Sequence, residues 1–253
     1  MLSSDPSWPR RLWIVRHGES AGNVAWTQAE ADELAEIPIE GRDMDVPLSP
    51  GGERQADALG GWFASMPEEE RPTVILCSTY ARARQTAKRV ARLIPGVQGP
   101  ILDERLREKE MGAFDRLTHR GIVARYPQEH ERRRLVGKFY YRPPGGESWC
   151  DVVLRLRGVV GDMQLRYRRE RVLVVAHQVT VLCLRYLVEE LDEAAILAID
   201  DEAFVANCSV TWYAPVAREG GREALELRDY NLVTPMEETG APVTTAPDPK
   251  APR

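Results

Sequence analysis

Three short, largely apolar runs mark the chain, and each ends at a polar residue. The runs, with the residues that follow them, are residues 12–15 with Arg16 and His17, residues 73–77 with Ser78, and residues 171–176 with His177. Because none of the runs alternates between apolar and polar positions, each is typical of a strand buried on both faces of a parallel sheet. Ligands of open α/β sheets bind beyond the carboxyl ends of the strands, so the pattern predicts a site there.

Between and after these strands, apolar residues recur three or four positions apart, which is the spacing of amphipathic helices. Ser49 and Pro50 begin one such helix as its cap and first residue. The expected helices cover residues 49–66, 81–94, 148–167 and 179–190, shorter ones cover 120–126 and 129–136, and residues 20–37 form a helix or an ordered loop. Further strands are expected over residues 208–213 and 223–229. This alternation predicts a three-layer α/β/α fold with a mostly parallel central sheet and helices on both faces.

The composition along the chain predicts one domain over residues 11–232. Residues 1–10 form a leader outside the core, and the segment from 233 to 253, rich in Pro, Thr and Ala, is expected to be a disordered tail. The polar and aromatic segment of about residues 115–144 is predicted to be an insertion that caps one end of the sheet.

Charge and cysteine content exclude several classes of partner. The formal net charge of -5 gives no overall attraction to nucleic acid or to a membrane surface. No apolar run approaches the ~18 residues of a membrane span, and the N-terminus lacks a signal-peptide core, so we expect a soluble cytoplasmic protein without nucleic-acid or membrane partners. The four cysteines lack metal-ligand spacing, so no metal and no disulfide is expected.

The strand ends bring a distinctive set of side chains together. Parallel neighbouring strands would place His17 and His177 in one crevice, with Arg16 beside them. Arg82 would lie in the first turn of a helix, where a cation is unfavourable unless the helix N-terminus also holds an anion. Two guanidinium groups and two imidazoles suit a dianion, and a phosphoryl group in transfer is stabilised by such donors.

Four motifs resemble those of the histidine phosphatase (phosphoglycerate mutase-like) superfamily. The motif from Arg16 to Ser20, with Asn23, is similar to the family signature, whose first histidine becomes phosphorylated. Residues 78–86 resemble the segment whose central arginine binds the phosphoryl group, here Arg82. Residues 106–108, followed by a glycine at 112, resemble the segment that supplies the acid, and His177 matches the second histidine.

A narrower likeness to a phosphatase-like branch of the superfamily lies in residues 131–133, 139–143 and 146–148. Other positions depart from the family pattern. Gln178 follows the second histidine, where the family commonly has glycine, and Arg116 also replaces a frequent glycine. Residues 26–47 lack the tryptophan- and asparagine-rich stretch of the cofactor-dependent mutases, which weakens a mutase interpretation.

The resemblance implies that His17 is the nucleophile and Glu108 the proton donor, although Glu104 and Glu110 compete for the latter role within the same charged run. No metal and no cofactor is required. The expected catalytic residues are Arg16, His17, Arg82, Glu108 and His177. The residues expected to contact the substrate are Gly18, Ser20, Asn23, Arg142 and Gln178.

Three functions are compatible with this set: a phosphomonoesterase acting through a phosphohistidine, a phosphoglycerate mutase-type enzyme, and a non-catalytic phosphate-binding module. The complete catalytic set argues against the third. The expected partner is a small phosphorylated substrate, whose identity the sequence leaves open. The oligomeric state, with a dimer as one option, is open as well.

Overall fold

The computed structural model describes residues 8–218 and 223–246, and within these a six-stranded sheet forms the centre of the molecule. The strand order is β3-β2-β4-β1-β5-β6. The strands are β1 (Arg11–Arg16), β2 (Val74–Cys77), β3 (Ile101–Leu102), β4 (Arg171–Ala176), β5 (Val210–Ala217) and β6 (Glu223–Leu232). Strands β1 to β4 run parallel, whereas β5 and β6 are antiparallel additions at one edge.

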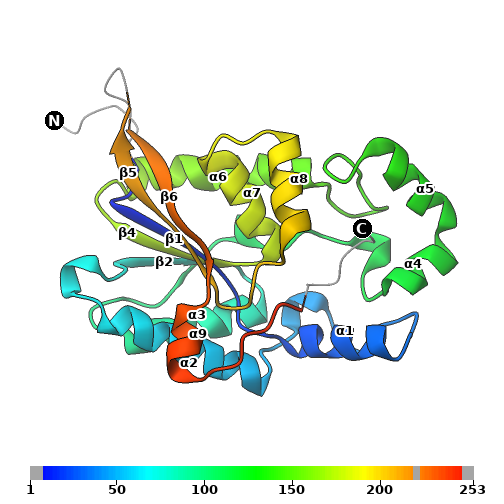
Figure 1. Cartoon of the computed structure of the whole chain (residues 1–253), viewed down its shortest axis with the longest axis horizontal. Coiled ribbons are helices and arrows are strands. Elements are labelled where there is room, and N and C mark those ends of the chain that lie inside the picture. Colours follow the sequence, from blue (N-terminus) through cyan, green and yellow to red (C-terminus); the bar gives the residue numbers. More distant parts are fainter. Residues whose placement is uncertain (1–7, 219–222, 247–253) are drawn as a thin grey trace.

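Helices cover both faces of the sheet (Figure 1). On one face lie α6 (Trp149–Arg166), α7 (Gln178–Val188) and α8 (Glu193–Glu202), and on the other lie α2 (Pro50–Ser65), α3 (Ala81–Leu93) and α9 (Thr234–Thr239). Successive side chains of β1 point to opposite faces. Leu12 and Ile14 therefore belong to the core under α6 and α7, and Trp13 and Val15 to the core under α2 and α3. The predicted three-layer fold is confirmed.

Most of the remaining helices lie beyond the carboxyl ends of the parallel strands. They are α1 (Ala21–Ala31), α4 (His119–Arg125) and α5 (Pro127–Val136), with the short 3-10 helices η1 (Asp43–Asp45), η3 (Glu104–Leu106) and η4 (Gly112–Phe114). The 3-10 helix η2 (Glu68–Glu70) lies at the amino ends instead, where Glu70 pairs with Arg11 at the start of β1. Figure 1 places α4 and α5 at the end of the molecule opposite the β5–β6 edge. A small core of Phe114, Leu117, Ile122 and Tyr141 holds this region together.

The C-terminal segment differs from the sequence prediction. Residues 233–246 are not a disordered tail: α9 packs against α2 through the buried Met236, and the chain continues along the surface to residue 246. Composition missed this because the segment is held by the buried Met236 and by single contacts of Pro242, Thr244 and Ala246 with distant side chains. Residues 247–253 of the predicted tail and residues 1–7 of the predicted leader lie outside the described residues. Trp8, from the same leader, packs against the core.

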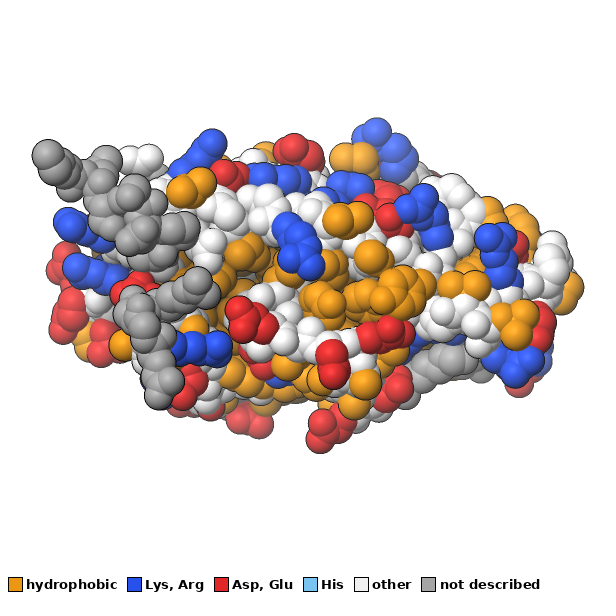
Figure 2. Space-filling view, turned by 90° about the horizontal axis from the view of Figure 1, so that it is seen from above, with side chains coloured by type: hydrophobic (Ala, Val, Ile, Leu, Met, Phe, Trp, Pro, Cys, Tyr) orange, Lys and Arg blue, Asp and Glu red, His pale blue; other side chains and the backbone are white. Residues whose placement is uncertain are grey.

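Two further elements were not expected, namely the two-residue edge strand β3 and helix α8. Among the described residues, no helix combines the length and the apolar character that crossing a membrane requires. Figure 2 shows charged side chains of both signs interspersed over one face of the molecule, around hydrophobic side chains gathered near its middle.

Candidate active site

The register of two neighbouring strands brings the two histidines together. Arg16 of β1 pairs with Ala176 of β4, and the backbone N–H of His17 donates to the carbonyl of Ala176 at 2.9 Å. His17 and His177 therefore directly follow two paired residues, at the ends of the adjacent parallel strands β1 and β4. Both are fully buried, and their ring centroids lie 5.0 Å apart.

Hydrogen bonds define which nitrogen of His17 carries its proton. Nδ1 lies 2.7 Å from the carbonyl oxygen of Gly18, which can only accept, so Nδ1 is the protonated nitrogen. Nε of Arg82 donates to Nε2 of His17 at 3.2 Å, so Nε2 presents its lone pair. The tight turn after His17 needs glycine, because a Cβ on Gly18 would lie 2.5 Å from the carbonyl oxygen of Gly52.

Arg82 is the second residue of α3 and its side chain is only 2% exposed. The guanidinium group lies over the ring of Tyr80, with its carbon 5.0 Å from the ring centroid. Nη1 and Nη2 donate to the two carboxylate oxygens of Asp43 at 3.0 Å each, and Nη1 also donates to the Asp43 carbonyl at 2.8 Å. A cation in the first turn of α3 is thus balanced by a carboxylate from η1.

Arg16 contacts segments that are distant in sequence. Nη1 donates to the carbonyl of Val205 at 2.8 Å, and Nη2 donates to the carbonyl of Ala246 at 2.7 Å. Nδ2 of Asn23 also donates to Ala246, at 3.4 Å. Asn23 and Ser20 form the capping box of α1, so both residues order the turn that follows His17.

His177 is the N-cap residue of α7, and its Nε2 lies 2.8 Å from the hydroxyl oxygen of Ser78 at the end of β2. The ring of Tyr80 packs edge-on against it, with centroids 5.1 Å apart. Strand β2 therefore contributes to the same site as β1 and β4.

Glu108 is buried and lies close to the start of α7. Its Oε2 accepts from the backbone N–H of Val179 at 3.3 Å, and its Oε1 accepts from the N–H of Lys109 at 2.8 Å. The N-terminus of a helix favours a negative charge, so the start of α7 stabilises a carboxylate at this position.

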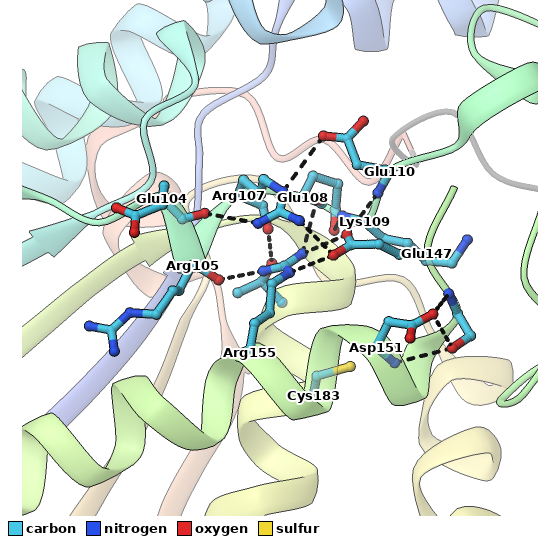
Figure 3. Close-up of polar contacts among 12 residues, drawn as sticks. Glu104, Arg105, Arg107, Glu108, Lys109, Glu110, Glu147, Asp151, Arg155 and Cys183 are labelled. Carbon is cyan, nitrogen blue, oxygen red and sulfur yellow. Dashed lines mark hydrogen bonds and ion pairs between the residues drawn. The ribbon is translucent and has the colours of Figure 1, made fainter. Parts of the chain in front are cut away.

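A carboxylate from the loop before α6 fixes the segment that carries Glu108 (Figure 3). Glu147 accepts from Arg107 Nη2 at 2.7 Å, from Arg155 Nε and Nη2 at 3.0 and 3.1 Å, and from the N–H of Glu110 at 3.1 Å. Arg155 also donates to the carbonyls of Arg105 and Glu108. Burial alone would raise the pKa of Glu147, but the hydrogen bond and charge of Arg155, aided by Arg107, lower it below its usual value.

A cavity of about 320 Å³ adjoins part of this set, with Arg16, His17 and His177 outside its lining. Arg82 and Glu108 line it, together with Asp43, Lys109 and Arg116. Glu110 lines it too, accepting from the hydroxyl of Tyr80 at 2.8 Å, whereas Glu104 does not. Burial lowers the pKa of Lys109 to about 8, and the polar contact of its amine is Met111 Sδ at 3.7 Å. No cluster of potential metal ligands occurs among residues 8–218 and 223–246.

The five expected substrate contacts, Gly18, Ser20, Asn23, Arg142 and Gln178, are not among the residues that line this cavity. Gly18, Ser20 and Asn23 instead shape the turn after His17 and the start of α1. The guanidinium of Arg142 pairs with Asp151 at the start of α6. Gln178 is fully buried at the start of α7, and in the described structure its side-chain amide has no hydrogen-bond partner.

Sequence reasoning missed Asp43, Asn207 and Glu147 as parts of the site. Asn207 Nδ2 donates to the carbonyl of His17 at 3.0 Å and so supports the turn that positions the imidazole. Asp43 and Asn207 lie in loops without a distinctive local pattern, so nothing in their neighbourhood signals their role. Glu147 lies in the 146–148 motif, which could have identified it.

Curated proteins similar to this chain include enzymes with phosphatase names. A 6-phosphofructo-2-kinase/fructose-2,6-bisphosphatase from Caenorhabditis elegans is 34% identical over 178 residues, which are 70% of this chain and 33% of that protein. A fructose-2,6-bisphosphatase from Saccharomyces cerevisiae is 33% identical over 176 residues, again 70% of this chain and 33% of that protein. The chain thus spans about a third of the length of these relatives.

Solved structures share the fold over most of both chains. A protein described as mycobacterial hydrolase 1 has a TM-score of 0.70 and 26% identity, covering 88% of this chain and 98% of that one. A mycobacterial glucosyl-3-phosphoglycerate phosphatase in complex with VO3 has a TM-score of 0.66 and 25% identity, covering 88% and 99%.

The family model described as the Histidine phosphatase superfamily (branch 1) matches residues 12–229. This match confirms the resemblance carried by the sequence motifs, and the chain belongs to the histidine phosphatase superfamily.

Proposed function

We propose that this protein is a phosphomonoesterase that transfers the phosphoryl group of its substrate to His17 and then to water. The observation that carries the proposal is the hydrogen bond from Arg82 Nε to Nε2 of His17. It fixes the imidazole in the neutral tautomer whose lone pair faces the arginine. A nucleophile and a permanent cation thus meet at the point where a phosphoryl group would be attacked.

In the first step, the lone pair of His17 Nε2 attacks phosphorus in line with the leaving oxygen. The P–N bond forms and the P–O bond breaks, and its electron pair stays with the leaving oxygen. Glu108, in its protonated form, gives that oxygen a proton. Arg16, Arg82 and His177 supply donors to the equatorial oxygens, where the negative charge is spread.

In the second step, water attacks the phosphorus of phosphohistidine. The Glu108 carboxylate takes a proton from the water, the P–N bond breaks, and its electron pair returns to Nε2 of His17. The hydrogen bonds from the N–H groups of Val179 and Lys109 stabilise the carboxylate that the first step leaves and the second step uses. Inorganic phosphate leaves, and the acid form of Glu108 is ready for the next turnover.

The proposed substrates are small phosphorylated molecules. Relatives named for phosphorylated sugars, fructose-2,6-bisphosphatase and glucosyl-3-phosphoglycerate phosphatase, support this size class. We assign the selection of the substrate to the residues that line the 320 Å³ cavity. Two of them, Asp115 and Arg116, belong to the segment that continues into α4 and α5. No metal is needed in this scheme, because the arginines provide the positive charge.

The proposal is tested with purified protein in a chelator. We expect release of inorganic phosphate from p-nitrophenyl phosphate and an acid-labile phosphoprotein in rapidly quenched samples. His17→Ala should abolish both, whereas His119→Ala, which alters an exposed histidine on α4, should change neither.

Full hydrolysis by His17→Ala would refute the proposed nucleophile. Isomerisation of 3-phosphoglycerate that outpaces its hydrolysis would identify a mutase instead. Binding of phosphate without turnover of either substrate would identify a non-catalytic module.

A further inference from the structure

Arg82 has two edges with paired N–H groups, and the structure uses them differently. A planar guanidinium can bind an oxyanion through Nη1 and Nη2 at its end, or through Nε and Nη2 along its side. The Asp43 carboxylate binds the end, with Oδ1 on Nη1 and Oδ2 on Nη2 at 3.0 Å each. Nε points to Nε2 of His17.

From this division we infer that Asp43 is a positioning residue for the proposed phosphoryl transfer. By holding the end of the guanidinium, it turns the Nε–Nη2 side toward His17. A phosphoryl group bound to Nε2 of His17 would then face two parallel N–H donors, Nε and Nη2 of Arg82. The inference rests on the proposed function, and it assigns to a loop aspartate the orientation of the arginine.

Several contacts make this orientation rigid. The backbone carbonyl of Asp43 accepts a hydrogen bond from Arg82 Nη1 at 2.8 Å, which is the third hydrogen bond between these two residues. The ring of Tyr80 lies beside the guanidinium, with 5.0 Å between the Arg82 guanidinium carbon and the ring centroid. The Arg82 side chain is 2% exposed and the Asp43 side chain 35% exposed, so the ion pair is shielded from solvent mainly around the guanidinium. Both residues line the cavity.

The loop that carries Asp43 is attached to the rest of the site at both ends. Ser20 forms a β-bridge with Leu48, whose N–H also donates to Gln85 of α3 at 2.7 Å. At the other end, Arg116 Nη1 donates to the carbonyl of Ile39 at 3.2 Å. These anchors hold η1 over α3, so Asp43 reaches Arg82 without extending across solvent.

A matched control lies two residues away. Asp45 is on the same 3-10 helix, and its carboxylate pairs with the exposed Arg42 at 2.7 Å, away from Arg82. Asp43→Ala should reduce kcat for p-nitrophenyl phosphate by about 10- to 100-fold with a smaller change in KM, because misplacing a catalytic group by ~1 Å costs up to about 100-fold. Asp45→Ala should leave both parameters within about twofold, since exposed pairs contribute little.

Two further readouts separate positioning from a general structural effect. Orthovanadate, which imitates the five-coordinate transition state, should lose affinity for Asp43→Ala in parallel with kcat/KM, while inorganic phosphate should lose less. In an Arg82→Ala background, Asp43→Ala should change vanadate affinity by less than about twofold, because a residue that acts through Arg82 has no effect without it.

Unchanged or tighter vanadate binding by Asp43→Ala would overturn the inference, and tighter binding would mean that Asp43 competes with the substrate. An equal loss of vanadate affinity in the Arg82→Ala background would overturn it too.

If Asp43→Ala fails to fold by circular dichroism, the isosteric Asp43→Asn is measured and should show an intermediate loss of vanadate affinity. If the wild-type protein hydrolyses no phosphomonoester, the proposed function fails, and calorimetric vanadate binding still tests the orientation of Arg82.

Discussion

Replacing Glu147 with glutamine tests whether the clamp between this carboxylate, Arg107 and Arg155 positions Glu108. The carboxylate accepts four hydrogen bonds of 2.7 to 3.1 Å, three of them from guanidinium groups, and its side chain is 13% exposed. Glutamine keeps the shape, but its amide NH2 would face guanidinium N–H groups. Arg155, 11% exposed, would lose its carboxylate partner.

The expected loss of stability follows from this geometry. Removing one partner of a buried ion pair costs about 3–5 kcal/mol. The lower end applies here because Arg107 is 31% exposed and one amide oxygen still accepts. A loss of about 3 kcal/mol corresponds to a fall in Tm of roughly 6–12 °C for a domain of this size.

The activity should fall in a way that depends on the leaving group. Displacement of Glu108 by loosening of its segment should slow transfer of the phosphoryl group to His17 from alkyl phosphates, which need a proton on the leaving oxygen, by at least about 10-fold in kcat/KM. The kcat/KM for p-nitrophenyl phosphate, whose phenolate leaves without a proton, should change by less than about threefold. Because kcat/KM excludes the later attack of water, it isolates the step in which the leaving groups differ. Thermal unfolding by circular dichroism and phosphate release well below Tm measure the two effects.

Glu104→Gln is the matched control, because Glu104 lies on the same segment, is exposed and does not line the cavity. It should leave Tm and both rates unchanged. The reasoning is refuted if Glu147→Gln has the wild-type Tm, or if kcat/KM falls by the same factor for both substrates.

Three other changes give distinct outcomes. Gly18→Ala should lower both Tm and kcat, because its Cβ would lie 2.5 Å from the Gly52 carbonyl oxygen; wild-type values for both would contradict this. Truncation after Thr239 removes two acceptors of the buried Gln55 amide and should lower Tm by roughly 2–8 °C, at about 1–2 kcal/mol, in a differential scanning calorimetry experiment. Lys109→Met should raise Tm at pH 7, because burial lowers the pKa of this amine to about 8 and its charged form destabilises the fold below that pH. The gain should shrink as pH rises from about 8 to about 10.4, the unfolded value, and a gain independent of pH would contradict the assignment.

Local patterns in the sequence were sufficient for the central elements. The apolar runs before His17, Ser78 and His177 have no alternation because both faces of the sheet are covered, and that burial is readable residue by residue. The caps at Ser49 and Ser148 likewise mark the starts of α2 and α6, since the capping hydrogen bonds are made within three residues.

Elements held by distant contacts were not readable in this way. Helix α9 and residues 240–246 have the composition of a tail, yet the Gln55 amide and Arg16 bind their backbone oxygens. A backbone carbonyl is the same for every residue type, so such contacts leave no trace in composition. The edge strand β3 is too short for a period to be recognised.

The sequence by itself determined the family, the α/β layers and the set of side chains at the strand ends, because strand burial, helix caps and the motif residues are local properties. Only the tertiary structure decided how these groups face one another. The β1–β4 register places the imidazole centroids 5.0 Å apart, and Asp43, from a loop about 40 residues away in sequence, binds the end of the Arg82 guanidinium. Such relations depend on distances between segments far apart along the chain, which no local pattern encodes.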